Sequence, residues 1–461
     1  MEVNNILKTT DRSDHVSIEI EDEDEVLIAA ITEEITCKPS SQCFIYKVPK
    51  KYQTERDIET FEPRVVSIGP YHHGKVSLIA TEVYKRWYLY DLISERTTRN
   101  TTLKDFVKAI RKLEVRAREY YAEPVKLTSN EFVKMMVFDG CFILELLYKY
   151  IERGISEDEG DENEDKDDKE GSNNKNDPIF GTTWMIYRLR KDLVLLENQI
   201  PFIVLQTLFD LAKDHNGGYF LNELVTIFFQ PILPSMRPVT TSSFIKGKHI
   251  LDLLRSHLLP SSRHMKGGNY PEWEYIRSAT ELRESGVRFR KKGDLADGLL
   301  DITFTKDGVL EIPPFFFGES WNILLPNLIA LEQSRCDYTD QITSYFIFFD
   351  SLINTEDDVK LLRTQGIMEG LINEDEKVAD AINNLFKGAV VDKFYYDGLF
   401  TRVNAYCRNW KRKKAKMHKW KVSLQRDYFS TPWSVISVFT VFVVLVLTLT
   451  QTIFSILSYS P

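Results

Sequence analysis

Cysteine is scarce in this sequence, and its five cysteines are scattered: Cys37, Cys43, Cys141, Cys336 and Cys407. The chain has no C-x-x-C pair and no Cys/His cluster at the spacing of a zinc site. This pattern favours a reducing compartment over a disulfide-stapled extracellular domain. The N-terminal stretch MEVNNILKTTDRSDH also has no apolar run of signal-peptide length, so the sequence does not predict secretion.

A strong overall charge is missing as well. The formal net charge is -9 over 461 residues, and residues 157–170 alone contain ten acids and two lysines. The rest of the chain is therefore close to neutral, and its charge predicts no nucleic-acid partner. Because 43% of the residues are hydrophobic, the composition does provide enough apolar material for a packed core.

The short signatures of known catalytic sites are absent too. The chain has no G-x-S-x-G, no P-loop, no G-x-G-x-x-G, no H-E-x-x-H and no set of kinase motifs. The sequence therefore predicts no reaction class, no cofactor and no metal. An active site need not leave a short motif, so an enzyme of unknown class stays the alternative hypothesis.

The apolar pattern predicts a mainly helical fold. Apolar residues recur every three or four positions over 103–121, which indicates an amphipathic helix, and residues 131–151 form a nearly all-apolar, buried helix. A further helix is expected between a capping residue, Thr355, and Gly366. Residues 286–317 alternate with period two around Lys306-Asp307-Gly308, which predicts a small β hairpin or sheet there.

The composition changes along the chain predict its organisation. Residues 1–42 are a polar, acidic leader expected to be disordered, and residues 43–425 form the folded domain. A disordered acidic insertion interrupts that domain at 156–177. A basic juxtamembrane segment is expected at 408–421 and a transmembrane helix at 433–457.

The membrane prediction rests on the end of the chain. Trp433 to Leu457 are 25 residues without a charge, and a helix of that length spans about 37 Å, whereas the hydrocarbon core is about 30 Å thick. A single C-terminal transmembrane helix is therefore predicted, with the body of the chain cytoplasmic and the anchor in the plasma membrane or an endomembrane. Eight basic residues precede it and are expected to face anionic lipid: Arg408, Lys411, Arg412, Lys413, Lys414, Lys416, Lys419 and Lys421.

Two adjacent histidines, His72 and His73, are the low-probability functional candidates. They lie in SIGPYHHGK between Gly69-Pro70 and Gly74, which punctuate turns. Adjacent residues face different ways on a helix or a strand, so the pair does not have the spacing of two metal ligands. A structural turn, in which the imidazoles satisfy nearby backbone groups, is favoured over metal binding or acid–base chemistry. Cys141 in DGC and the Glu197-Asn198-Gln199 stretch are likewise interpreted as structural, by core packing and by capping of chain ends.

Several long blocks resemble one plant family. They are FIYKVPKKY, PRVVSIGPYHHGK, FVKMMVFDGCFILELLY, DPIFGTTWMIYRLRKDLVLLENQIPFIVLQTLF, SATELRESGVRF, LEIPPFFF, QITSYFIFFDSLINTEDDVKLLRTQGI and LQRDYFSTPWSVISV. In this order the blocks are similar to the family called domain of unknown function two-four-seven, over about residues 44–457. The resemblance implies a plant protein with one C-terminal transmembrane helix. It implies no catalytic activity and no cofactor, so no functional residue is carried over from the family.

The combined evidence favours a membrane-anchored binding, signalling or recognition module. Its expected partners are the membrane through residues 433–457, a protein and anionic lipid, but not nucleic acid. The alternative is a membrane-tethered enzyme, which should gather convergent titratable groups in one concave site.

Overall fold

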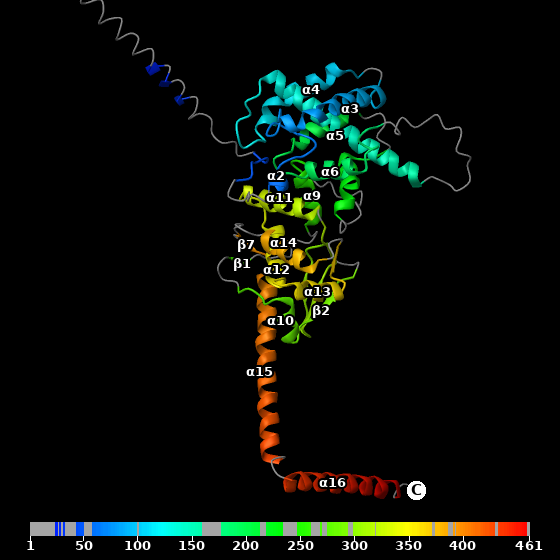
Figure 1. The fold of residues 1–461 in the computed structure, drawn as a ribbon, viewed down its shortest axis with the longest axis vertical. Coiled ribbons are helices and arrows are strands. Elements are labelled where there is room, and N and C mark those ends of the chain that lie inside the picture. Colours follow the sequence, from blue (N-terminus) through cyan, green and yellow to red (C-terminus); the bar gives the residue numbers. More distant parts are fainter. Residues whose placement is uncertain are drawn as a thin grey trace, which may run out of the picture. The chain divides into compact units, whose positions relative to one another are not determined.

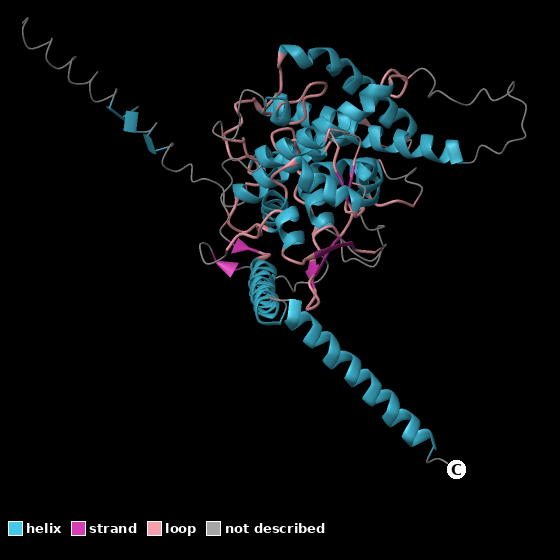
Figure 2. Cartoon of the chain, turned by 60° about the horizontal axis from the view of Figure 1, so that its bottom comes forward, coloured by secondary structure: helices cyan, strands magenta, loops and turns pink. Residues whose placement is uncertain are grey.

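The computed structural model describes residues 24–25, 27–28, 31–32, 43–49, 58–98, 101–158, 177–212, 218–233, 247–259, 268–269, 274–293, 298–318, 320–370, 374–385, 391, 393–428 and 432–458. Most of the predicted leader, 1–42, and most of the predicted insertion, 156–177, lie outside these residues. The chain divides into two compact units: Met1–Pro231 with Val239–Ser256, and Ile232–Pro238 with His257–Pro461. Helices account for most of the regular structure in each unit, and the strands are short (Figures 1 and 2).

The first unit is built around the long helix α5, Ser129–Asp158. Helices α3, α4, α7 and α8 all pack against it (Figure 1). The helices of this unit are α2 (Ile58–Phe61), η2 (Val76–Thr81), α3 (Glu82–Glu95), α4 (Leu103–Arg118), α5, α6 (Thr183–Leu193), α7 (Phe202–Leu211) and α8 (Leu221–Phe229). The chain then continues through η5 (Gln230–Ile232) and α9 (Ile250–Leu258). The central place of α5 follows from its composition, because its apolar residues surround the helix and are buried on every side.

The predicted amphipathic helix is α4. Phe106, Ile110 and Ala117 on its inner face are buried, as the apolar spacing predicted. At its start the Asp105 carboxylate accepts a hydrogen bond from the Thr102 backbone N–H at 2.9 Å. This side chain satisfies one of the backbone donors that the first turn of a helix leaves open.

The second unit contains α10 (Ala279–Glu284), α11 (Trp321–Ser334), α12 (Gln341–Leu352), α13 (Glu356–Thr364), α14 (Asp375–Leu385), α15 (Asp397–Tyr428) and α16 (Pro432–Ser458). Its strands are β1 (Gly268–Asn269), β2 (Arg288–Lys291), β3 (Thr303–Phe304), β4 (Val309–Ile312), β5 (Phe315–Phe316), β6 (Met368–Glu369) and β7 (Lys393–Phe394). The predicted cap of α13 is confirmed: the Thr355 N–H donates to the Asp358 carboxylate at 3.0 Å, and Gly366 has a φ of 65° beyond the helix end.

The predicted hairpin at 286–317 is confirmed at its turn and is part of a larger sheet. Strands β3 and β4 pair antiparallel around Gly308, whose φ is 78°. Strand β2 pairs with β4 in parallel, giving the strand order β2-β4-β3. Strands β5 and β6 also pair in parallel, and β1 pairs antiparallel with β7. A parallel pair needs a longer connection than a hairpin, which is why alternation in the sequence predicted the hairpin alone.

The predicted transmembrane helix over 433–457 is wrong. A helix does form at that place, α16. Its second half holds Thr448, Thr450, Gln451 and Thr452. Within the described part of the chain, no helix combines the length and the apolar character required to cross a membrane. The single-pass, C-terminally anchored location that depends on this helix therefore loses its basis, as does the membrane-tethered form of the enzyme alternative.

Candidate functional site

The two histidines lie in a tight turn between glycines of positive φ. Gly69 has a φ of 75° and Gly74 a φ of 78°. The His73 N–H donates to the Pro70 carbonyl at 3.4 Å, and the Lys75 N–H donates to the His72 carbonyl at 3.3 Å. The His73 side chain is exposed, whereas that of His72 is buried. The turn therefore sends the neighbouring imidazoles into different environments.

The His72 imidazole is buried beside a carboxylate. Its Nε2 lies 3.5 Å from Glu197 Oε2, and neither ring nitrogen has a hydrogen bond within the described part of the chain. The expectation that this ring satisfies backbone groups is therefore not met. Burial, followed by the charges of Lys75 and Lys47, lowers the pKa of His72 to about 3, so the ring is neutral at neutral pH.

No metal centre forms around this turn in the described structure. Among the described residues, no group of three or more His, Cys, Asp or Glu side chains is placed to hold a metal ion. The Cys141 thiol is buried within α5, and that burial raises its pKa. A thiol in that state is a poor nucleophile, since the thiolate is the reactive form.

The extended segment before the turn, residues 64–69, is held by buried side chains rather than by a neighbouring strand. The Asp192 carboxylate accepts hydrogen bonds from three consecutive backbone N–H groups, at 3.1 Å from Arg64, 2.7 Å from Val65 and 2.9 Å from Val66. Asn198 accepts from the Ile68 N–H at 2.7 Å and donates to the Val66 carbonyl at 3.0 Å. Buried backbone polar groups must find partners, and here side chains supply them.

A buried ion pair also contacts the backbone of residues 64–69. The Lys85 Nζ on α3 lies 2.7 Å from Asp139 Oδ1 on α5 and also donates to the Ser67 carbonyl. The other Asp139 oxygen accepts from the Gly69 N–H at 2.8 Å. Burial works against the charged form of Lys85, but Asp139 and Glu82 together raise its pKa. The lysine is therefore charged, and its charge is compensated inside the core.

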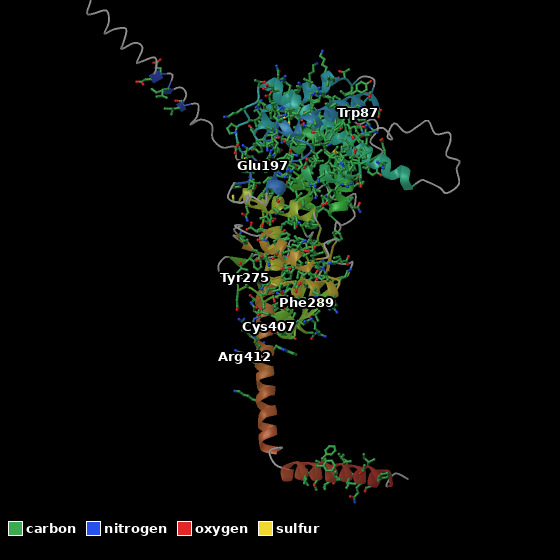
Figure 3. The ribbon with its side chains drawn as sticks, viewed as in Figure 1. Trp87, Glu197, Tyr275, Phe289, Cys407 and Arg412 are labelled. Carbon is green, nitrogen blue, oxygen red and sulfur yellow. The ribbon has the colours of Figure 1, made fainter. Side chains whose placement is uncertain are left out.

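The Glu197-Asn198-Gln199 stretch has the capping role that the sequence indicated. The Gln199 Nε2 donates to the Leu193 and Leu195 carbonyls at 2.7 and 2.8 Å, at the end of α6. Glu197 accepts from the Val48 N–H at 2.7 Å. These side chains form hydrogen bonds with backbone groups where the chain is neither helix nor strand. Figure 3 labels Glu197 in the first unit.

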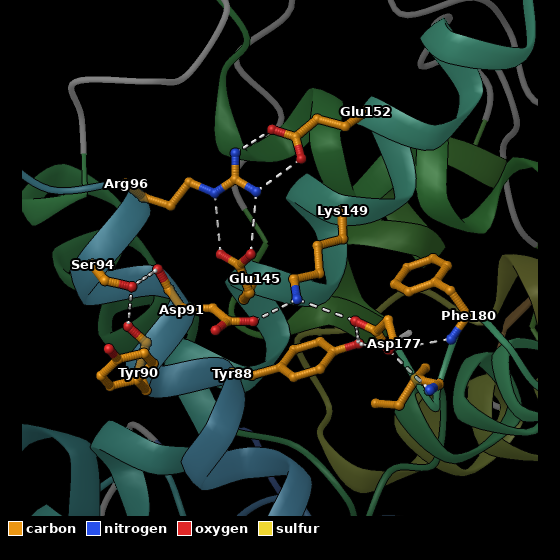
Figure 4. A network of polar contacts seen from close by, with 11 residues as sticks. Tyr88, Tyr90, Asp91, Ser94, Arg96, Glu145, Lys149, Glu152, Asp177 and Phe180 are labelled. Carbon is orange, nitrogen blue, oxygen red and sulfur yellow. Dashed lines mark hydrogen bonds and ion pairs between the residues drawn. The ribbon is translucent and has the colours of Figure 1, made fainter. Parts of the chain in front are cut away.

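A second buried network ties α3 to α5 (Figure 4). Arg96 donates to Glu145 at 3.2 Å and to Glu152 at 2.8 Å. The Lys149 Nζ lies 2.6 Å from Asp91 and 3.1 Å from Asp177, and the Tyr88 hydroxyl also donates to Asp177 at 3.0 Å. The same ammonium lies 4.9 Å from the Trp87 ring centroid and 4.7 Å from that of Tyr88. Burial raises the pKa of Glu145 to about 7, although Arg96 and Lys149 oppose the shift.

These two networks bury charged groups of α3 beside Tyr88, Leu89 and Leu92, while some of its apolar groups stay exposed. Lys85 and Asp91 are buried on its inner side. On the outer side Val83 and Tyr90 are 59% and 70% exposed, and Val76 and Ile79 of the preceding η2 are 85% and 53% exposed. Val83 and Tyr90 lie seven residues apart on one face of α3, with the exposed Arg86 beside them, and Val76 and Ile79 extend the exposed apolar surface onto η2. We call Val76, Ile79, Val83 and Tyr90 the α3 stripe.

The stripe is hard to predict from the sequence. A helix is normally predicted from apolar residues that recur every three or four positions and form one face toward the core. The sequence EVYKRWYLYDLISE has no such recurrence. The one available signal is the stretch of valine, isoleucine, tyrosine and tryptophan next to Lys85 and Asp91. Exposed apolar groups on a helix that buries charge depart from the usual pattern.

The basic residues predicted to face a membrane lie on α15. The described side chains among them, Arg408, Lys411, Arg412 and Lys419, are exposed, and Figure 3 labels Arg412 on this helix. Arg408 also contacts Glu274 at 3.1 Å. The side chains of Lys413, Lys414, Lys416 and Lys421 are outside the described structure. The histidines belong to the first unit and the basic residues to the second.

Comparison with known proteins supports the family resemblance over nearly the whole chain. The family model DUF247, described as plant protein of unknown function, matches residues 45–447. The UPF0481 protein At3g47200 of Arabidopsis thaliana is 31% identical over 441 residues, covering 90% of this chain and 87% of its own length. The putative UPF0481 protein At3g02645 of the same plant is 22% identical, covering 83% of this chain and 84% of its own length. No solved structure matches the chain.

Proposed function

Since the chain belongs to the DUF247 family of plant proteins of unknown function, we propose that it is a binding module for a protein partner and not a catalyst. The observation that carries this proposal is the α3 stripe. Covering the exposed valine, isoleucine and tyrosine side chains of the stripe with a partner removes apolar surface from water, which is favourable. Tyrosine in particular is enriched among the residues that dominate protein interfaces.

The buried polar groups support the same proposal. Asp139, Lys85 and Asp192 are each bonded to backbone or to an opposite charge. Their chemistry is that of a scaffold, because a catalytic group must reach a substrate. Two such networks fix α3 against α5 and thereby hold the stripe in one orientation, which lowers the entropy cost of binding.

Proximity labelling in plant cells, followed by binding assays with the purified full chain, tests the proposal. Val83→Lys and Tyr90→Lys should each abolish binding of the labelled partner, since each places a charge in the contact. Their melting temperatures should stay close to that of the wild type, because both positions are exposed. Trp184→Lys is the matched control, since Trp184 is an exposed aromatic residue on α6.

Two results would contradict the proposal. One is a set of labelled proteins that is unchanged by both stripe substitutions. The other is a chemical turnover by the purified chain that a substitution at a buried polar residue abolishes, which would favour the enzyme alternative.

The expected contact between the basic residues of α15 and anionic lipid is a separate proposal, and it needs no helix that crosses a bilayer. The exposed side chains of Lys411, Arg412 and Lys419 support it, because clustered cations attract anionic headgroups. Cosedimentation with vesicles containing phosphatidylserine measures this binding, and added salt should weaken it. Binding that persists when Lys411 and Arg412 are replaced by glutamate would refute it.

A further inference from the structure

The outer face of α4 carries four cationic side chains at a constant spacing. Lys104, Lys108, Lys112 and Arg116 follow one another every fourth residue, and all four are exposed. At about 1.5 Å per residue, neighbouring cations are spaced about 6 Å apart along the helix. The cations therefore form a slanted row of positive charge about 18 Å long, which winds around the helix by about 40° from each cation to the next.

The row forms no ion pair within the residues that the structure describes. None of the four side chains has a hydrogen bond there either. Of the two acids of α4, Glu114 pairs with Arg118 at 2.9 Å and Asp105 bonds to the backbone of Thr102. Hydrogen bonds from Thr102, followed by the charges of Lys108 and Lys104, lower the pKa of Asp105, so the start of the row is partly compensated. Arg118, which is paired with Glu114, does not belong to the row.

Such an arrangement weakens the helix itself. Like charges four residues apart on a helix repel each other, and the row contains three such pairs. An anionic partner would relieve this repulsion, and it would do so best if its own charges repeated at the same interval. Glutamates at every fourth residue of another α-helix have that interval.

We infer that this face of α4 binds an acidic helical segment of a partner protein. Val115 favours a protein over an anionic polymer or a lipid headgroup. It lies on the same face among the cations and is 74% exposed, so it provides an apolar contact that phosphate groups cannot use.

The test uses the purified full chain and a synthetic helical peptide of about 20 residues, with glutamate at every fourth position and leucine beside it. A peptide with lysine in place of glutamate, a single-stranded DNA oligonucleotide and phosphatidylserine vesicles are the other arms. The variant combines Lys108→Glu and Lys112→Glu. The control combines Lys306→Glu and Lys360→Glu, which change the charge equally at two exposed positions of the other unit.

The wild type and the control should bind the glutamate peptide equally, and the variant should lose about tenfold or more in affinity. Higher salt should weaken wild-type binding, and Val115→Ser should weaken it at every salt concentration. The variant should fold, because it turns two of the three repulsive pairs into attractive ones, and circular dichroism checks this. Equal binding by variant and wild type would overturn the inference. Preferential binding of the oligonucleotide or the vesicles through Lys108 and Lys112 would overturn it too. The α3 stripe takes no part in this test, so either idea can fail alone.

Discussion

The Lys85 ammonium lies 2.7 Å from the Asp139 carboxylate, and the two buried residues are 54 positions apart in the sequence. This pair joins α3 to α5 at the place where both hold the segment before the histidine turn. A buried pair of opposite charges adds little net stability compared with an apolar pair, but losing one member leaves the other uncompensated. The main effect of the pair is therefore to define how α3 packs against α5.

Breaking this pair should destabilise the protein strongly. Lys85→Met should lower the free energy of unfolding by about 3–5 kcal/mol, because Asp139 would stay buried without its counter-ion. Combining it with Asp139→Asn should cost less than the two single changes added together. Chemical denaturation measures all three variants. Lys75→Met, which removes an exposed partner of Glu62, is the control and should cost about 0–1 kcal/mol. Strictly additive costs would show that the two charges do not interact.

The two glycines of the histidine turn should differ in their tolerance of alanine. A Cβ on Gly69 would lie 2.4 Å from the Gln199 carbonyl oxygen, whereas a Cβ on Gly74 meets no atom within 4 Å. Both have positive φ, so Gly74→Ala should cost about 1 kcal/mol for backbone strain alone. Gly69→Ala should cost about 3 kcal/mol or more, because a backbone clash is added. Thermal melting checks the pair, and equal costs would mean that the segment moves freely away from Gln199.

Replacing His72 should change how stability depends on pH. The pKa of His72 is about 3 in the folded chain against 6.5 for the free side chain. The unfolded chain therefore takes up a proton first as the pH falls below about 6.5, and the wild type loses stability in that window. His72→Phe removes this loss, so the stability difference between the two proteins should change by about 2 kcal/mol from pH 8 to pH 5. His249 is present in both proteins, so its contribution cancels in the stability difference between them. Parallel stability curves, or stoichiometric metal lost on substitution, would contradict this account of His72.

Glu145 should have the opposite effect. Its pKa is raised to about 7 in the folded chain from 4.5, so the folded chain binds the proton more readily than the unfolded chain. Its contribution to stability is therefore fully present below about pH 4.5 and is lost as the pH rises to about 7. Relative to Glu145→Gln, the wild type should become less stable across that range. Denaturation at several pH values measures this, with Glu152→Gln as the control for losing a carboxylate beside Arg96. A constant difference between wild type and Glu145→Gln would contradict it.

The sequence predicted the features that depend on neighbouring residues. The apolar period of α4, the nearly all-apolar character of α5 and the cap of α13 at Thr355 were all readable, because each is encoded within a few turns of chain. The β3–β4 hairpin at Gly308 and the turn around His72 follow from local backbone preferences in the same way. The family was readable from long blocks of sequence. The C-terminal apolar run was also evident in the sequence, but the prediction of a transmembrane helix there is wrong.

Only the tertiary structure decided which side of α3 faces the core. Lys85 and Asp91 are buried there together with Tyr88 and Leu92, whereas Val83 and Tyr90 are exposed, so residue type alone does not predict the buried side. Lys85 can be buried because Asp139 meets it from another helix, and Asp91 can be buried because Lys149 does. Composition determines how much charge and apolar surface a chain has. Which charges meet depends on contacts between residues far apart in sequence, and those contacts exist only once the helices have packed.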